Sequence, residues 1–131
     1  MKTTRTNAET VIDQWLAAVN AHELEAVLSL YAENSVLLPT FSPGIVNSTD
    51  GLHDYFSALA SRPGLAVSLS DEAVIYQVAG DQEIASGIYF FHWEIEGERH
   101  SFESRFTFVI DSSADRPIIH HHSSEMPKVS N

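Results

Sequence analysis

The 131-residue chain carries 18 acidic and 7 basic side chains, and its formal net charge of −11 repels nucleic-acid phosphates and anionic lipid surfaces. It contains no cysteine, which excludes disulfides and thiol catalysis. An apolar signal segment and a membrane-spanning apolar run are both lacking, so we expect one cytoplasmic domain over residues 1–131 with neither nucleic acid nor membrane as a partner.

The first half of the chain has helical periodicity. Two helix faces are indicated by apolar residues at 3.6-residue spacing: Val11, Trp15 and Ala18, then Leu24, Val27, Leu28 and Tyr31. Residues 35–38 predict a short strand that Pro39 ends. Residues 48–50 offer the hydroxyl and carboxyl groups of a helix N-cap, which predicts a third helix ending before Arg62.

The second half alternates with period two after Gly64, and turn-forming residues recur at 79–82, 96–98 and 111–116. This spacing predicts four strands in an antiparallel meander. Helices followed by a hairpin-linked sheet are typical of the α+β class. We therefore expect a cone-shaped, curved antiparallel sheet packed on three N-terminal helices, with a pocket at the open end of the cone.

Arg105 is the one basic residue that neither a terminus, a helix end nor a turn explains. It lies inside the predicted strand 102–110, where a charged group is costly unless it is paired. A structural explanation is an ion pair with Glu103 on the same strand face. A functional explanation is that Arg105 binds a ligand in the pocket.

Three consecutive histidines on the last predicted strand favour the functional explanation. If residues 111–116 form the loop, Thr107 lies opposite His120 and Arg105 lies opposite His122. A register shift of one residue would replace His120 and His122 by His121 on that face, whereas a shift of two would keep both.

The same register predicts that the neighbouring row of the strand faces away from the pocket. This row consists of Ser104, Phe106, Phe108 and Ile110. Large apolar side chains on an outer sheet face would form an exposed patch in a monomer, so we expect a homodimer through this row.

A metal site is an alternative to ligand binding on this strand face. His120 and His122 have the spacing of two ligands on one strand, with Glu103 or His53 as a third. Because Arg105 beside them would repel a cation, we expect no metal. No glycine-rich phosphate loop or dinucleotide motif is present, so we expect no cofactor.

The order of elements and the segments LYAENSVLLPT, TDGLHDYFSAL, ESRFTFVI and HHHSSEMP resemble the nuclear transport factor 2-like (SnoaL-like) superfamily. Within it the chain is similar to free-standing relatives of the calcium/calmodulin-dependent protein kinase II association domain. The resemblance implies a cone that dimerises through its sheet, possible assembly into a larger ring, and no kinase activity. It implies a pocket containing Glu103, Arg105, His120 and His122, and it places Tyr89 where the relatives have another arginine.

Two classes of function fit this pocket. The first is a binding or assembly module in which Arg105 holds a small organic carboxylate and the histidines supply further donors. The apolar walls would then come from three aromatic residues: Trp15, Tyr31 and Tyr89.

The second class is a cofactor-independent acid/base enzyme of the ketosteroid isomerase or polyketide cyclase type. Glu103 or His122 would act as the base, and Tyr89 or Arg105 would stabilise an enolate oxygen. No feature of the sequence selects catalysis over binding.

Overall fold

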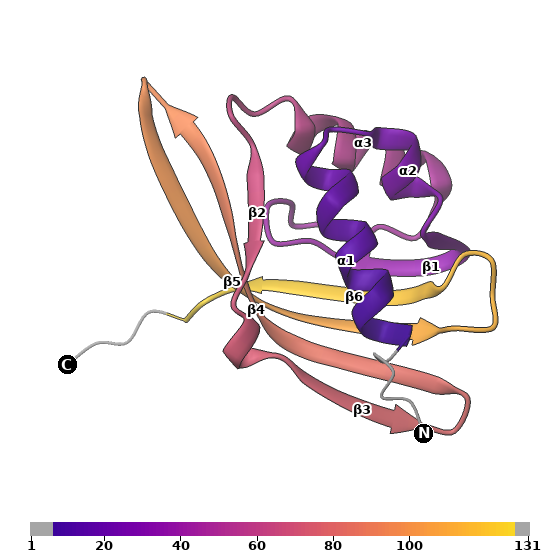
Figure 1. The fold of residues 1–131 in the computed structure, drawn as a ribbon. Helices are drawn as coiled ribbons and strands as arrows, with labels where there is room; N and C mark the ends of the chain where they lie inside the picture. Colours follow the sequence, from indigo (N-terminus) through magenta and orange to yellow (C-terminus); the bar gives the residue numbers. More distant parts are fainter. Residues whose placement is uncertain (1–6, 128–131) are drawn as a thin grey trace.

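The computed structural model describes residues 7–127, which form an α+β fold with the helices in the first half of the chain (Figure 1). The α-helices are α1 (Asn7–Asn20), α2 (Leu24–Leu28) and α3 (Thr49–Ala60). A short 3₁₀ helix, η1, covers Asp71–Ala73. The strands are β1 (Tyr31–Leu38), β2 (Ala66–Leu69), β3 (Ile75–Ala79), β4 (Gln82–Ile95), β5 (Glu98–Asp111) and β6 (Ile118–Glu125).

The strands form one curved, mostly antiparallel sheet in the order β1-β6-β5-β4-β2, and β3 pairs with the first half of β4. β1 runs parallel to β6. The long hairpin of β4 and β5 turns at Glu96 and Gly97, whose φ angles of 53° and 82° are typical of a tight hairpin turn. Figure 1 shows this hairpin extending past the end of the other strands.

All three α-helices lie against one face of the sheet (Figure 1). Helix α1 contributes Trp15, which packs edge-on against Phe108 of β5 with ring centroids 5.5 Å apart. Helix α3 begins at the predicted cap, where the Ser48 side chain accepts a hydrogen bond from the Gly51 N–H. Among residues 7–127, no helix combines the length and apolar character needed to cross a bilayer.

Two boundaries differ from the sequence prediction. Tyr31 belongs to β1 and not to the second helix, because it pairs with Ile118 of β6 and its ring packs inside the cone. The segment predicted as one strand after Gly64 is two strands, β2 and β3, separated by η1. Both pair with β4, so the break allows one long strand to hold two short partners.

The predicted register between the last two strands is displaced by two residues. Thr107 pairs with His122, and Val109 pairs with His120, after an irregularity between Val109 and Ile110. The shift preserves the alternation, so His120 and His122 share the face of Arg105 as predicted.

The prediction that this face lines the pocket was wrong, because it points away from the helices. Glu103, Arg105 and His122 are exposed on the outer face, and His120 is partly exposed there. The row predicted to face outward, Ser104, Phe106, Phe108 and Ile110, is buried against the helices. Burying three large apolar side chains stabilises the fold far more than burying a charged arginine would. The homodimer contact predicted through that row is therefore wrong, since its side chains are in the core.

Gly87 of β4 lies where η1 and a side chain of β5 approach the β4 backbone closely. A Cβ atom at this position would lie 2.9 Å from the Ala73 carbonyl oxygen and 2.9 Å from a Phe106 ring carbon. We expect Gly87→Ala to lower the free energy of unfolding in urea by about 1–3 kcal/mol, because rigid neighbours must move. Gly44→Ala is the matched control: its added Cβ meets nothing within 4 Å, so an equal loss would contradict the packing argument.

Candidate functional site

A chain of buried polar side chains runs through the interior of the cone. Trp15, Tyr31 and Tyr89 are each 1% exposed and His121 is 2% exposed. The Trp15 Nε1–H donates to the Tyr31 hydroxyl at 3.0 Å, and that hydroxyl lies 2.7 Å from His121 Nδ1. The other ring nitrogen of His121 lies 3.1 Å from the Tyr89 hydroxyl. A single imidazole thus joins α1, β1 and β4.

The donors and acceptors of this chain fix one histidine tautomer. Indole N–H only donates, so the Tyr31 oxygen accepts from Trp15 and its own hydrogen is free for His121 Nδ1. We therefore assign the ring hydrogen of His121 to Nε2, which donates to Tyr89. The Tyr89 hydroxyl in turn donates to Ser123 Oγ at 2.5 Å. In this arrangement each ring nitrogen and each phenol hydroxyl of this hydrogen-bonded network has a partner.

The chain continues toward the loop after β1. The Ser123 hydroxyl lies 2.5 Å from Thr40 Oγ1, and Thr40 donates to Ser104 at 3.4 Å. Thr40 stands in the loop between β1 and α3, so these bonds tie that loop to the inner face of the sheet.

Burial keeps the titratable groups of the interior uncharged at neutral pH. Desolvation lowers the pKa of His121 to about 3, and the neighbouring His120 and His122 add to the lowering. Desolvation also raises the pKa of Tyr31 and of Tyr89 well above the usual value for a phenol. His121 is consequently a very weak base at pH 7.

The inner cavity beside this network is almost filled. It has a volume of about 10 Å³, which is close to the space of one water molecule. Its lining combines the polar groups of Tyr89, His121 and Ser123 with apolar side chains such as Leu37 and Phe91. A ligand larger than a water molecule has no room there in this conformation.

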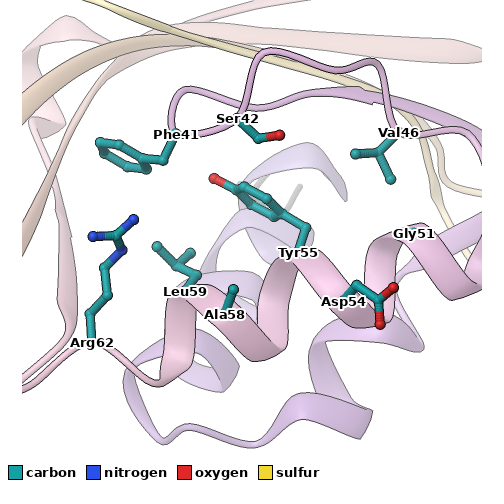
Figure 2. Close-up of a pocket in the computed structure, with 9 residues that line it drawn as sticks. All are labelled: Phe41, Ser42, Val46, Gly51, Asp54, Tyr55, Ala58, Leu59 and Arg62. Atoms are coloured by element: carbon teal, nitrogen blue, oxygen red, sulfur yellow. The ribbon is translucent and has the colours of Figure 1, made fainter.

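A larger pocket lies at the mouth of the cone between α3 and the loop after β1 (Figure 2). Its volume is about 380 Å³. We call it the mouth pocket, and its lining residues are Phe41, Ser42, Val46, Gly51, Asp54, Tyr55, Ala58, Leu59 and Arg62. Figure 2 shows Arg62 and Phe41 at one end and Asp54 at the other, with the Tyr55 ring between them.

Arg62 is the cation of the mouth pocket. Its guanidinium carbon lies 4.2 Å from the Trp93 ring centroid and 5.8 Å from the Phe41 ring centroid. Its Nε is buried and has no hydrogen-bond partner. Among residues 7–127, no carboxylate forms an ion pair with it. Stacking on aromatic faces holds the guanidinium plane while leaving its edge available for an anion.

The sequence model of the calcium/calmodulin dependent protein kinase II association domain matches residues 5–127. The chain belongs to this family. A solved association domain of the same family from Xanthomonas campestris is 27% identical with a TM-score of 0.85, and the match covers 98% of this chain and 91% of that one. A search of curated protein sequences found no significant match.

More distant structures share the fold of this association-domain chain. A nuclear transport factor 2-like protein with a cystatin-like fold from Novosphingobium aromaticivorans is 13% identical with a TM-score of 0.77, covering 95% of this chain and 82% of that one. A ketosteroid isomerase-like protein from Erwinia carotovora atroseptica is 17% identical with a TM-score of 0.70, covering 92% and 94%. The predicted superfamily and the predicted cone fold are therefore confirmed.

The site residues predicted for this association-domain chain fall into two groups. Trp15, Tyr31 and Tyr89 lie inside the cone, where they join the buried network. Glu103, Arg105, His120 and His122 lie on the outer face and line no part of the mouth pocket. Arg105 and His122 instead border a shallow hollow of about 430 Å³ on that outer face.

The alternatives weighed for Arg105 have different outcomes. Within the part of the chain that the structure describes, no ion pair joins Arg105 to Glu103. In the same part, His120, His122, Glu103 and His53 do not gather into a group that could hold a metal ion. Whether Arg105 and His122 contact a ligand stays a prediction.

Sequence reasoning missed Arg62 and considered His121 only as the outcome of a register shift. Arg62 lies just after the Ser61 C-cap of α3, so in the sequence it looks like an ordinary helix end. Its aromatic neighbours come from distant segments, so no local pattern marked it. The histidine triplet did mark His121, because alternation places it on one face and its two neighbours on the other.

The depressed pKa of His121 predicts a specific loss of stability in acid. Between the ordinary histidine pKa of about 6.5 and the folded value of about 3, only the unfolded chain binds a proton on this imidazole. This contribution to stability is therefore present above pH 6.5 and is lost as the pH falls, at about 1.4 kcal/mol per pH unit. Urea unfolding at pH 7, 6, 5 and 4 measures the slope.

The control compares how the free energy of unfolding depends on pH in two histidine variants. His121→Gln should remove about one proton from the pH dependence, whereas His122→Gln, which changes an exposed side chain, should keep the slope of the parent protein. Equal slopes for all three proteins would contradict the assignment of a buried neutral imidazole.

Proposed function

We propose that the chain is a binding module for a small organic carboxylate, which it holds in the mouth pocket through Arg62. The observation that carries this proposal is the partly buried guanidinium, whose Nε has no partner and whose plane stacks on Trp93. Arg62 lines the mouth pocket, and among residues 7–127 no carboxylate pairs with it, so its guanidinium can bind an incoming anion there. The two oxygens of a carboxylate match the planar fork of an arginine in a bidentate geometry.

The remainder of the mouth pocket suits an apolar tail. Phe41, Val46, Tyr55 and Leu59 supply apolar surface next to the cation, and Ser42 offers a hydroxyl. A volume of about 380 Å³ falls within the usual range for small-ligand sites. The ligand class expected from the sequence is kept in this proposal, while the cation that binds it moves from Arg105 to Arg62.

Acid/base catalysis of the ketosteroid isomerase or cyclase type is the weaker alternative. Its expected base, Glu103 or His122, lies on the outer face of the sheet, away from both the mouth pocket and the inner cavity. Burial lowers the pKa of His121, the imidazole inside the cone, to about 3, and both of its ring nitrogens are hydrogen-bonded to tyrosine hydroxyls. General-base catalysis works best when the pKa lies near the working pH.

Thermal unfolding with a panel of small monocarboxylates tests the binding proposal. A ligand at about 100 times its Kd stabilises the fold by about 2.7 kcal/mol, which raises the Tm by roughly ten degrees for a domain of this size. We expect Arg62→Ala to abolish this shift. Arg62→Lys should keep only part of it, because the charge remains and the planar fork is lost.

Two other arginines serve as comparisons. Arg99 donates to the Gly64 carbonyl at 3.0 Å and does not line the mouth pocket. The Tm shift caused by the ligand should therefore persist in Arg99→Ala. Arg105→Ala tests the outer face directly. If Arg105→Ala abolishes the shift and Arg62→Ala does not, the carboxylate binds the outer hollow and the mouth-pocket proposal is wrong.

We also propose that the outer face of the sheet joins two copies of the chain in a homodimer. The support is a set of incompletely buried apolar side chains on that face, including Ile84, Ile88, Phe90 and Val109. Glu103 and Arg105 lie beside them, and a two-fold axis that passes between these two positions would bring Glu103 of each copy against Arg105 of the other. A ring of such dimers would need a further contact.

Sedimentation at micromolar concentration measures this assembly. We expect a species of about twice the 14.5 kDa chain mass, and Ile88→Glu should convert it to monomer by burying a charge in the contact. Ile45→Glu, at a 66% exposed position on the loop after β1, should leave the dimer intact. A monomer in the parent protein would contradict the proposal.

A further inference from the structure

Tyr55 separates the mouth pocket from the inner cavity. It lines both spaces, and Leu59, one helical turn further along α3, is the other residue that does so. Burial raises the pKa of the Tyr55 phenol to about 12, and the nearby Phe41 backbone offsets part of this rise. Figure 2 shows the ring extending from α3 toward the loop that carries Phe41 and Ser42.

The space behind Tyr55 differs in chemistry from the space in front of it. In front lies Arg62, a fixed positive charge in a pocket open to solvent. Behind lies the neutral network, where Tyr89, His121 and Ser123 present hydroxyl and imidazole groups among apolar side chains. A ligand that passed the ring would therefore have its carboxylate outside and its far end against uncharged hydrogen-bonding groups.

The position of the ring is determined from two sides. Tyr55 packs edge-on against Phe56 with ring centroids 5.2 Å apart, which fixes it relative to α3. Phe41, whose backbone lies near the Tyr55 hydroxyl, packs edge-on against Phe91 at 5.1 Å and Trp93 at 4.9 Å. Phe41 and Trp93, which also lie beside the Arg62 guanidinium, therefore help to hold the Tyr55 ring as a partition between the mouth pocket and the inner cavity.

We propose that Tyr55 determines ligand length: it confines the tail to the mouth pocket, so that the protein selects short monocarboxylates. This inference rests on the proposed carboxylate site at Arg62. A tail that starts at Arg62 runs along Tyr55 and Leu59 and gains affinity only while its methylenes leave water. Because the ring blocks the way inward, further methylenes remain in solvent and add nothing.

Straight-chain acids from acetate to decanoate, titrated calorimetrically, test this proposal. In the parent protein each methylene should tighten binding about fourfold, as expected for about 0.8 kcal/mol per buried CH₂, until the affinity becomes constant. In Tyr55→Ala the gain should continue for at least two more methylenes, giving an affinity for the longer acids about 16-fold higher than the parent plateau. Tyr55→Phe keeps the ring and should keep the parent plateau.

A plateau at the same chain length in Tyr55→Ala and in the parent protein would overturn the proposal. If Tyr55→Ala does not fold, as judged by circular dichroism, Tyr55→Leu replaces it and should move the plateau in the same direction by a smaller amount. Ala58→Phe is a matched control, because Ala58 lines only the mouth pocket. In this variant the affinity should become constant at a shorter acid than in the parent protein, while the inner cavity stays closed.

A neutral probe separates the failure of this inference from the failure of the carboxylate proposal. Benzyl alcohol needs no cation, and its hydroxyl can reach Tyr89 or Ser123 in the joined cavity. It should bind Tyr55→Ala, with or without the additional Arg62→Ala change, and not the parent protein. If no acid binds the parent protein but benzyl alcohol shows this pattern, the carboxylate site is wrong and the partition stands. Equal binding of benzyl alcohol to the parent protein and Tyr55→Ala would overturn the partition.

Discussion

The burial of one neutral imidazole determines where charge can lie in this molecule. His121 stacks on Phe108 with centroids 3.9 Å apart and forms hydrogen bonds with two tyrosines that have no access to solvent. Alternation along β6 then requires the residues on either side of it to face outward. The outward positions of His120, His122 and, through pairing with β5, Arg105 follow from this single constraint.

A neutral interior also supports our proposal of an anion site at the mouth of the cone. The resemblance to the kinase association domain predicts an arginine in the relatives at the position of Tyr89. In this chain that position is 1% exposed and next to a histidine whose pKa is already strongly lowered by burial. An arginine there would need an anion or a carboxylate beside it, and the inner cavity has no carboxylate in its lining. Tyr89 fills the place with a hydroxyl that Ser123 satisfies.

The sequence predicted the elements better than it predicted the faces. Helix α3 was recognisable because Ser48 caps it and Leu52, Phe56 and Leu59 follow the helical period. The shared face of Arg105 and His122 was also predictable, since alternation survives a register shift of two. Which face turns inward depends on the helices that cover it, and the apolar row of Phe106, Phe108 and Ile110 was the better indicator of that choice.

The candidate site depended on contacts that local sequence patterns do not contain. Arg62 gains its role from Trp93 and Phe41, which reach it only after β4 has curved over the helices and the loop after β1 has folded back. That loop is held by Thr40, whose partner Ser123 belongs to the same hydrogen-bonded chain as His121. The wall of the mouth pocket and the neutral core are therefore mechanically connected. Because the chain carries a net charge of −11, long-range attraction of an anion is unfavourable, so the selectivity of the proposed site would have to arise from close contact with Arg62.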